Sequence, residues 1–309
     1  MFSVLFPGQG SQNIGMAKEL FENFNYVKEY FLNADDLLSK KLSKIIFDGP
    51  KNELDQTENT QPAIFLVSYS FFKVIEKETE FKLKEAKYFA GHSLGEYSAL
   101  CCAEALSFDQ TINLLKRRGA AMQNALPNGE GGMLAILGQT IENINSILKE
   151  NEKKFTCYIA NDNSNGQIVL SGKKINLELL SEILIKKNIK FVKLPVSAPF
   201  HCPLMKNATD EMKNLIIETK FNDPIVNIIS NVTANPLIKS NDIKKFLIEQ
   251  IENPVRWRES INYMIRSGIN RFIEMGPGKV LSGLVKRIDR NVKLNQVNNF
   301  TDIKNLIND

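Results

Sequence analysis

The sequence is poor in the side chains that form disulfides or bind transition metals. Its 309 residues include only four cysteines and two histidines, and no two cysteines have the Cys-x-x-Cys spacing. Because a structural zinc site needs four nitrogen or sulfur ligands, the composition argues against such a site and against a secreted disulfide scaffold. An ion held by carboxylates alone is left open. We therefore expect no metal and no bound cofactor.

Long apolar runs and an excess of one charge are also missing. The longest apolar stretch, 63–72, contains two serines and is too short to cross a bilayer. The first eight residues include no basic residue, so they do not form a signal peptide and we expect a cytoplasmic protein. Lysine and arginine number 39 against 35 acidic residues, and they are interspersed. This pattern excludes a nucleic-acid reader and leaves a weak preference for an acidic partner.

What is present is an alternation of short apolar runs with helical patterns. Residues 2–6 predict a buried strand that ends in a tight Pro-Gly-Gln-Gly loop, and 88–90 predict a second one. Helical patterns cover about 13–24 and 61–76, and another helix begins after Ser93. Strands alternating with helices are typical of a parallel sheet covered on both faces, which is the α/β class.

A different plan is predicted between residues 127 and 195. The segment opens with Pro-Asn-Gly-Glu-Gly-Gly, the clearest break in the chain. The order of elements that follows is β-α-β-β-α-β, which is the ferredoxin-like plan, with strands at 133–137, 155–160, 168–170 and 190–194 and a polar turn at 161–167. We expect a large domain made of 1–126 and 196–309, with 127–195 inserted as a small subdomain. The later segment predicts strands at 226–230 and 271–274 and helices at 242–250, 258–266 and 279–287.

The sequence Gly91-His92-Ser93-Leu94-Gly95 fits the G-x-S-x-G pattern between a buried strand and a helix. In that context the sharp turn lifts the serine hydroxyl above the sheet, where the next backbone N–H can face a developing oxyanion. The pattern favours a nucleophile over a plain turn.

A serine nucleophile needs a base, because its hydroxyl is weak at neutral pH. His92 adjoins Ser93, so its side chain points elsewhere and a packed or hydrogen-bonded residue is the better interpretation. His201 lies in a loop between Pro199 and Pro203, just after the inserted subdomain. By elimination His201 is the candidate base, with a structural histidine as the alternative.

Arg118 gives an independent signal. Ser107 and Gln110 resemble a capping box that starts a helix running to Gln123. At helical spacing, Arg118 falls on the apolar face with Leu114, Leu115 and Met122. A buried arginine must meet an anion. That anion is either an internal carboxylate or the carboxylate of a substrate held by both arms of the guanidinium.

Together these residues resemble the malonyl-CoA:acyl carrier protein transacylases. The resemblance extends from Phe2 to about Arg287 and rests on six separated motifs: Phe6-Pro7-Gly8-Gln9-Gly10-Ser11-Gln12, Gly91-His92-Ser93-Leu94-Gly95-Glu96-Tyr97, Arg118-Gly119, Phe200-His201, Gln250 with Pro254-Val255-Arg256-Trp257, and Glu274-Met275-Gly276-Pro277-Gly278-Lys279. It implies an α/β-hydrolase-like large domain with a ferredoxin-like insertion.

The resemblance also implies a role for each matching residue. Ser93 would be acylated and His201 would be its general base, oriented by the main-chain carbonyl of Gln250 in place of a triad acid. The N–H groups of Gln9 and Leu94 would form the oxyanion hole. Arg118 would bind the malonyl carboxylate.

Three further residues match family positions that line the cleft. Gln61 and Asn161 carry less defined roles, and a helix-start residue and a turn residue are equally acceptable interpretations of them. Phe200 resembles the bulky residue that malonyl-selective members carry before the histidine, or it is ordinary packing. A pocket distinguishes one methyl group by only about 1–3 kcal/mol.

The implied activity is a ping-pong transfer of malonyl from coenzyme A through Ser93 to the phosphopantetheine thiol of an acidic acyl carrier protein, supplying fatty acid biosynthesis. The enzyme would be a monomer that meets the carrier transiently. Three alternatives remain. They are a polyketide acyltransferase acting in trans, a serine thioesterase or hydrolase that uses the same turn around Ser93, and a catalytically inactive docking module for carrier proteins. A hydrolase would need an acidic triad member and would not need Arg118.

Overall fold

A six-stranded sheet forms the centre of the large domain. The computed structural model describes residues 1–307. The strands are β1 (Phe2–Phe6), β2 (Tyr88–Gly91), β7 (Asn227–Ile229), β8 (Pro236–Leu237), β9 (Arg271–Met275) and β10 (Lys293–Val297). Their order is β10-β9-β1-β2-β7-β8, and every neighbouring pair is parallel except β7 with β8. Consequently the carboxyl ends of five strands meet at one edge of the sheet.

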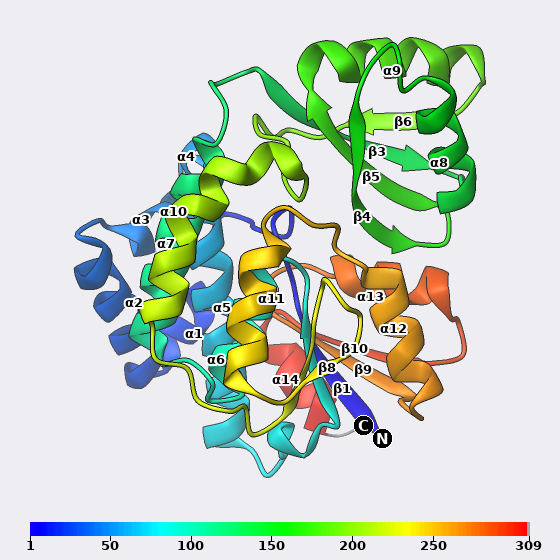
Figure 1. Cartoon of the computed structure of the whole chain (residues 1–309). Helices are drawn as coiled ribbons and strands as arrows, with labels where there is room; N and C mark the ends of the chain where they lie inside the picture. The colour runs from blue at the N-terminus through cyan, green and yellow to red at the C-terminus, as the bar shows by residue number, and fades with distance from the viewer. Residues whose placement is uncertain (308–309) are drawn as a thin grey trace.

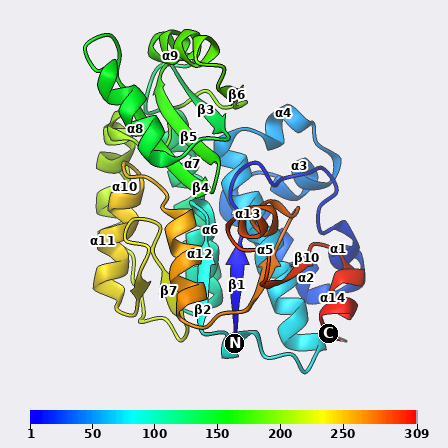
Figure 2. The same ribbon diagram turned by 90° about the vertical axis from the view of Figure 1, so that its right-hand side faces the viewer.

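Helices cover both faces of this sheet because its central strands are apolar on both sides (Figures 1 and 2). Val4 and Phe6 of β1 pack into one core, and Leu5 packs into the other. The helices of the large domain are α1 (Lys18–Asn23), α2 (Asn25–Leu38), α3 (Leu42–Asp48), α4 (Lys51–Leu54), α5 (Thr57–Glu78), α6 (Leu94–Cys102), α7 (Phe108–Gln123), α10 (Lys206–Glu218), α11 (Ser240–Gln250), α12 (Trp257–Arg266), α13 (Val280–Ile288) and α14 (Phe300–Ile307), with single 3-10 turns at Leu83–Glu85 and Pro203–Met205.

The small subdomain stands at the carboxyl edge of the large sheet (Figure 1). It contains β3 (Gly131–Leu137), α8 (Ile141–Glu150), β4 (Cys157–Ser164), β5 (Gln167–Lys173), α9 (Lys174–Lys186) and β6 (Lys190–Lys193). Its sheet is antiparallel with the order β4-β5-β3-β6. The helices and one sheet face enclose a separate core that includes Leu134, Ile144 and Leu180.

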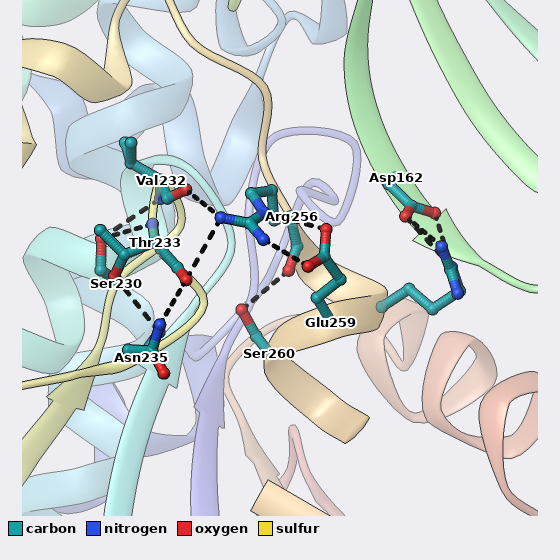
Figure 3. Close-up of polar contacts among 9 residues, drawn as sticks. Asp162, Ser230, Val232, Thr233, Asn235, Arg256, Glu259 and Ser260 are labelled. Atoms are coloured by element: carbon teal, nitrogen blue, oxygen red, sulfur yellow. Dashed lines mark hydrogen bonds and ion pairs between the residues drawn. The ribbon is translucent and has the colours of Figure 1, made fainter. Parts of the chain in front are cut away.

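The contacts that join the small sheet to the large domain include a β-bridge and an ion pair. Asn161 of β4 forms a parallel bridge with Val255, in which the Val255 N–H donates to the Ala160 carbonyl at 2.8 Å. Beside it, Arg258 of α12 holds the buried Asp162 carboxylate with two guanidinium nitrogens (Figure 3). Paired in this way, the Asp162 charge is compensated and fixes β4 against α12.

The predicted fold class is confirmed, including the parallel sheet and the inserted β-α-β-β-α-β subdomain. The division at residues 126/127 and 195/196 stays a prediction, although all four strands of the small sheet fall between those limits. The capping box of Ser107 and Gln110 is also confirmed, and α7 ends at Gln123.

Three local predictions were wrong. Residues 14–17 are turns with left-handed backbone at Gly15 and Ala17, so α1 begins only at Lys18. Residues 161–164 are not a turn: β4 continues to Ser164 through two register shifts, because its polar residues pair with β5 and with the 255 segment. Gln61 is not at a helix start, since α5 begins at Thr57.

No helix within residues 1–307 is long and apolar enough to span a membrane. The same residues contain no cluster of three or more histidine, cysteine, aspartate or glutamate side chains that could hold a metal ion. All four cysteines are buried free thiols.

Candidate active site

Ser93 lies where β2 turns into α6, at the carboxyl edge of the large sheet. We call this strand–turn–helix segment, from Gly91 to Gly95, the elbow. Its backbone has φ 55° and ψ −110°, a combination that a residue with a side chain rarely adopts. The turn leaves no room for side chains beside it: a Cβ on Gly95 would lie 2.2 Å from the Phe6 carbonyl oxygen. Asn231, just after β7, accepts from the Ser93 N–H at 2.7 Å and donates to the Gly91 carbonyl at 2.7 Å. The strained turn is therefore fixed from both sides.

The Ser93 hydroxyl and the His201 ring are in direct contact. Ser93 Oγ lies 2.8 Å from His201 Nε2, and His201 Nδ1 lies 2.8 Å from the main-chain oxygen of Gln250. A carbonyl oxygen can only accept, so the Nδ1 atom must carry the ring hydrogen. This leaves the lone pair on Nε2 to accept the Ser93 proton.

The surroundings of His201 keep the imidazole neutral. The side chain is buried, and burial together with the nearby Arg118 charge lowers its pKa to about 3. The hydrogen bond to the Gln250 carbonyl opposes the shift. A neutral ring at neutral pH is the form that can take a proton.

Arg118 enters the same site from α7 and is completely buried. Nη1 donates to Gln61 Oε1 at 2.8 Å, and Nη2 donates to Gln250 Oε1 at 2.8 Å and to Ser93 Oγ at 3.1 Å. Nε has no hydrogen-bond partner among residues 1–307. No carboxylate within residues 1–307 comes within 4.0 Å of the guanidinium, so the internal ion pair allowed by the sequence does not form. The cation faces the serine with neutral partners.

The predicted oxyanion donors lie next to Ser93. Leu94 is the first residue of α6, and the N–H groups of a first helical turn have no acceptor within the helix. Gln9 follows β1 in a loop pressed against the elbow, since a Cβ on the preceding Gly8 would come within 2.6 Å of the His92 carbonyl. The Gln9 side chain reaches Thr57 Oγ1 at 3.5 Å. Their function as an oxyanion hole stays a prediction.

The remaining predicted residues lie at different distances from this centre. Gln61 is part of it, because it binds Arg118 from inside α5. Asn161 is buried in β4 and makes no side-chain hydrogen bond within the described chain, and its backbone joins the two domains. Phe200 is buried in the larger core next to His201, and its carbonyl accepts from Ser171 Oγ at 2.6 Å. His92 points away to Asn163 Oδ1 at 2.9 Å, as expected.

A cleft that adjoins Gln9 and His92 separates the two parts of the molecule. One cavity of about 480 Å³ is lined by Gln9 and His92 of the elbow region and by Asn163 and Val169 of the small sheet. Its other side is formed by Lys279, just before α13, and by Val280 and Arg287 of α13. A second cavity, of about 640 Å³, adjoins Gln9 on the side of Thr57 and Gln123. The cleft is thus walled by both domains, with cations on the α13 side.

Comparison with known proteins agrees with this geometry. Residues 4–300 match the family model described as an acyl transferase domain. The malonyl CoA-acyl carrier protein transacylase of Bacillus subtilis (strain 168) is 46% identical over 291 residues, which is 94% of this chain and 90% of that protein. The chain belongs to the malonyl-CoA:acyl carrier protein transacylase family. The family predicted from the six motifs is confirmed.

Solved structures of transacylase-family proteins have the same fold. The acyl-carrier-protein-S-malonyltransferase of Bartonella henselae is 42% identical and superposes with a TM-score of 0.96, covering 99% of this chain and 98% of that one. A malonyl-transacylase solved in complex with a type II PKS acyl-carrier protein is 35% identical, with a TM-score of 0.95 and 99% coverage of both chains.

Two residues of this transacylase-family site were missed from the sequence. Glu96 is buried on α6 and accepts from Gln250 Nε2 at 2.7 Å and from the Asn231 N–H at 3.1 Å. Asn231 supports Ser93 as described above. The signals were present: a glutamate inside the otherwise apolar start of a helix, and an amide directly after a buried strand. Neither pattern says which partner such a residue finds.

Proposed function

We propose that this chain transfers malonyl from malonyl-CoA to the phosphopantetheine thiol of an acyl carrier protein through an ester on Ser93. One observation carries the proposal: Ser93 Oγ lies 2.8 Å from His201 Nε2 and 3.1 Å from Arg118 Nη2. A base and a buried cation without a carboxylate partner therefore meet at the same hydroxyl. A nucleophile that handles an acyl group bearing its own carboxylate needs this pairing.

In the first half-reaction, His201 Nε2 takes the proton of Ser93 as Oγ attacks the thioester carbonyl carbon. The tetrahedral oxyanion accepts from the N–H groups of Gln9 and Leu94. Collapse breaks the carbon–sulfur bond, and the leaving thiolate takes the proton from His201 to give coenzyme A. The product is malonyl-Ser93 with a neutral imidazole.

In the second half-reaction, the carrier thiol enters the position that coenzyme A left. A free thiol has a pKa of about 8.5, so His201 assists by taking its proton as sulfur attacks the ester. The bond between Oγ and the acyl carbon breaks, and Ser93 recovers the proton. Both steps balance without a metal or an organic cofactor, so we propose that none takes part.

The charge of Arg118 links substrate choice to this proton transfer. Arg118 is one of the causes that lower the His201 pKa. A malonyl carboxylate on the guanidinium would offset that charge and make His201 a better base when the right acyl group is bound. An acetyl group offers no such compensation.

The cavity lined by Gln9 and His92 suits a long thioester arm. Its apolar wall can contact the arm, and Lys279 and Arg287 stand at the α13 side, where an anionic coenzyme or an acidic carrier would approach. The related malonyl-transacylase bound to a type II PKS acyl-carrier protein supports a carrier as acceptor. We place this chain in fatty acid biosynthesis, in the cytoplasm and as a monomer that meets its carrier transiently.

The hydrolase alternative is disfavoured by the partner of His201. A serine hydrolase orients its histidine with a carboxylate. Here Nδ1 faces the neutral carbonyl of Gln250, which stabilises an imidazolium less well. The buried Arg118 would also have no use in a general esterase.

The test is intact-protein mass spectrometry after addition of malonyl-CoA and then of a holo carrier protein. We expect a stable malonyl adduct on the wild-type protein, discharged onto the carrier, and none on Ser93→Ala. Release of free malonate at the same rate with and without carrier would identify a hydrolase instead. No adduct under any condition would leave only the docking module. Parallel reactions with a fatty acid carrier and a polyketide carrier separate those two pathways.

A further inference from the structure

Glu96 is a buried carboxylate that no step above uses. It is 1% exposed, lies one turn into α6 from Ser93, and forms no ion pair within 4.0 Å among residues 1–307. Its oxygen Oε2 accepts two hydrogen bonds, from Gln250 Nε2 at 2.7 Å and from the Asn231 N–H at 3.1 Å. Burial raises its pKa to about 7, against the effect of these two bonds and of Arg118. Burying a carboxyl group costs free energy, so the interactions of this glutamate must compensate for that cost.

The hydrogen bond from Gln250 to Glu96 bears on the orientation of the Gln250 amide. A glutamine side chain can present either its oxygen or its nitrogen to a neighbour, and the surrounding groups decide which. Gln250 Nε2 faces two oxygen acceptors, Glu96 Oε2 and the Ser93 carbonyl at 3.1 Å. Gln250 Oε1 faces Arg118 Nη2 at 2.8 Å. With the amide reversed, oxygen would meet a carboxylate and nitrogen would meet a guanidinium.

The same glutamine also holds His201, through its main-chain oxygen at 2.8 Å from Nδ1. Gln250 is the last residue of α11, so the anchoring of its side chain decides where that carbonyl stands. On the other side, Glu96 holds Asn231, whose Oδ1 accepts from the Ser93 N–H. Glu96 Oε2 is thus connected to Ser93 through Asn231. Through Gln250 it is connected to both Arg118 and His201.

We infer that Glu96 is a positioning residue, which sets the Gln250 amide so that its oxygen meets Arg118 and its backbone orients His201. Because no carboxylate lies within 4.0 Å of the guanidinium among residues 1–307, its fork remains available to a substrate carboxylate. This inference rests on the proposed function, because the fork matters only if the acyl group carries a carboxylate.

The test compares malonyl and acetyl transfer in Glu96→Ala. Rates of adduct formation on Ser93 are measured with malonyl-CoA and acetyl-CoA, together with the melting temperature. We expect malonyl acylation to fall by about 10- to 100-fold, as for loss of one buried polar anchor, and the malonyl-to-acetyl ratio to fall at least several-fold. Glu96→Gln keeps an acceptor oxygen and should restore most of the ratio.

Asp35→Ala is the matched control. Asp35 is also a buried carboxylate and accepts from the Ser43 N–H at 2.8 Å and from Ser43 Oγ at 2.6 Å, but it lies on α2, away from the elbow. It should lower the melting temperature and leave the ratio unchanged. If Glu96→Ala does not fold, Glu96→Asp takes its place, because a shorter side chain withdraws the oxygen from Gln250; the ratio should fall in the same direction.

The outcomes separate the two proposals. A folded Glu96→Ala or Glu96→Asp with the wild-type ratio overturns the positioning role, and so does a Glu96→Gln variant with a ratio as low as that of Glu96→Ala. Wild-type protein that takes up no malonyl overturns the proposed function, and this inference with it.

Discussion

At the scale of single residues, Arg118 distinguishes this site from that of an ordinary serine esterase. The guanidinium is wholly buried, yet its hydrogen bonds go to two amide oxygens and a hydroxyl. A buried charge with neutral partners is costly unless an anion joins it during function. We therefore propose that the guanidinium binds a substrate carboxylate directly beside Ser93.

Removal of this cation should act on the substrate that carries a carboxylate. In Arg118→Ala we expect malonyl transfer to fall at least about 30-fold, since truncating one partner of a buried charge pair costs about 2–5 kcal/mol. Acetyl transfer should fall much less. Arg117→Ala, an exposed arginine of the same helix, is the control and should leave both rates unchanged. Equal losses for the two acyl groups would mean that Arg118 is structural.

The low pKa of His201 predicts a pH dependence of stability. The unfolded chain takes up a proton on this histidine below about pH 6.5, whereas the folded chain does so only near its pKa of about 3. Between these values the unfolded state binds more protons, so the free energy of unfolding must fall as the pH falls. Above about pH 6.5 the residue makes no contribution.

Denaturant unfolding at several pH values measures this effect. From pH 6.5 down to 4.5, wild-type protein should lose up to about 1.4 kcal/mol per pH unit more than His201→Gln, which has no imidazole to protonate. If the free energy of unfolding changed with pH equally in the two proteins, His201 would protonate in the folded state as easily as in the unfolded one.

At the scale of elements, the strand–turn–helix around Ser93 depends on glycine because backbone fills the space where a Cβ would lie. A Cβ on Gly95 would meet the Phe6 carbonyl oxygen at 2.2 Å. In contrast, Gly283 of α13 has nothing within 4 Å of its Cβ position and no left-handed backbone. The two positions form a natural pair for comparison.

We expect Gly95→Ala to lower the free energy of unfolding by about 3 kcal/mol or more, since β1 would have to move. Gly283→Ala should raise it by about 0.5–1 kcal/mol, because alanine is the better helix former. Urea denaturation followed by circular dichroism gives both values. A stable Gly95→Ala would mean that the elbow is looser than the contact between its backbone segments requires.

The sequence predicted elements best where apolar periodicity and turn residues agree. The elbow strand, α6, α7 and the inserted subdomain follow from such patterns. The strand β4 was predicted to end too early because Asn161 and its neighbours are polar, and polar residues are typical of turns. In the fold they pair with β5 and with Val255, which lies far along the chain. Tertiary pairing overrode the local pattern.

The same limit applies to the site. Ser93 and His201 were predicted from a motif and by elimination, and Arg118 from its place on an apolar helix face. No sequence pattern shows that Gln250, Glu96 and Asn231 form one hydrogen-bonded network, because Gln250 and Asn231 lie more than 130 residues after Glu96. Only the strand order brings β2 beside β7 and so places these side chains together.

At the scale of the whole molecule, the site is assembled between two parts. The large domain supplies Ser93, Arg118 and Gln250, and the chain returning from the small subdomain supplies His201. The bridge at Asn161 holds these parts together. The ion pair of Asp162 with Arg258 does the same (Figure 3). The cleft they enclose has the dimensions of a ligand site rather than of a packing defect.

We propose that one hydroxyl, activated by an imidazole backed only by a carbonyl, carries the acyl group between two thiols. Peptide mapping of the protein after brief exposure to malonyl-CoA locates that acyl group. We predict that malonyl is found on the peptide containing Ser93, and that the adduct forms at least about 100-fold more slowly in His201→Ala, as for loss of a general base. Malonyl on any other residue, or acylation of Ser93 at an unchanged rate without His201, would contradict the account.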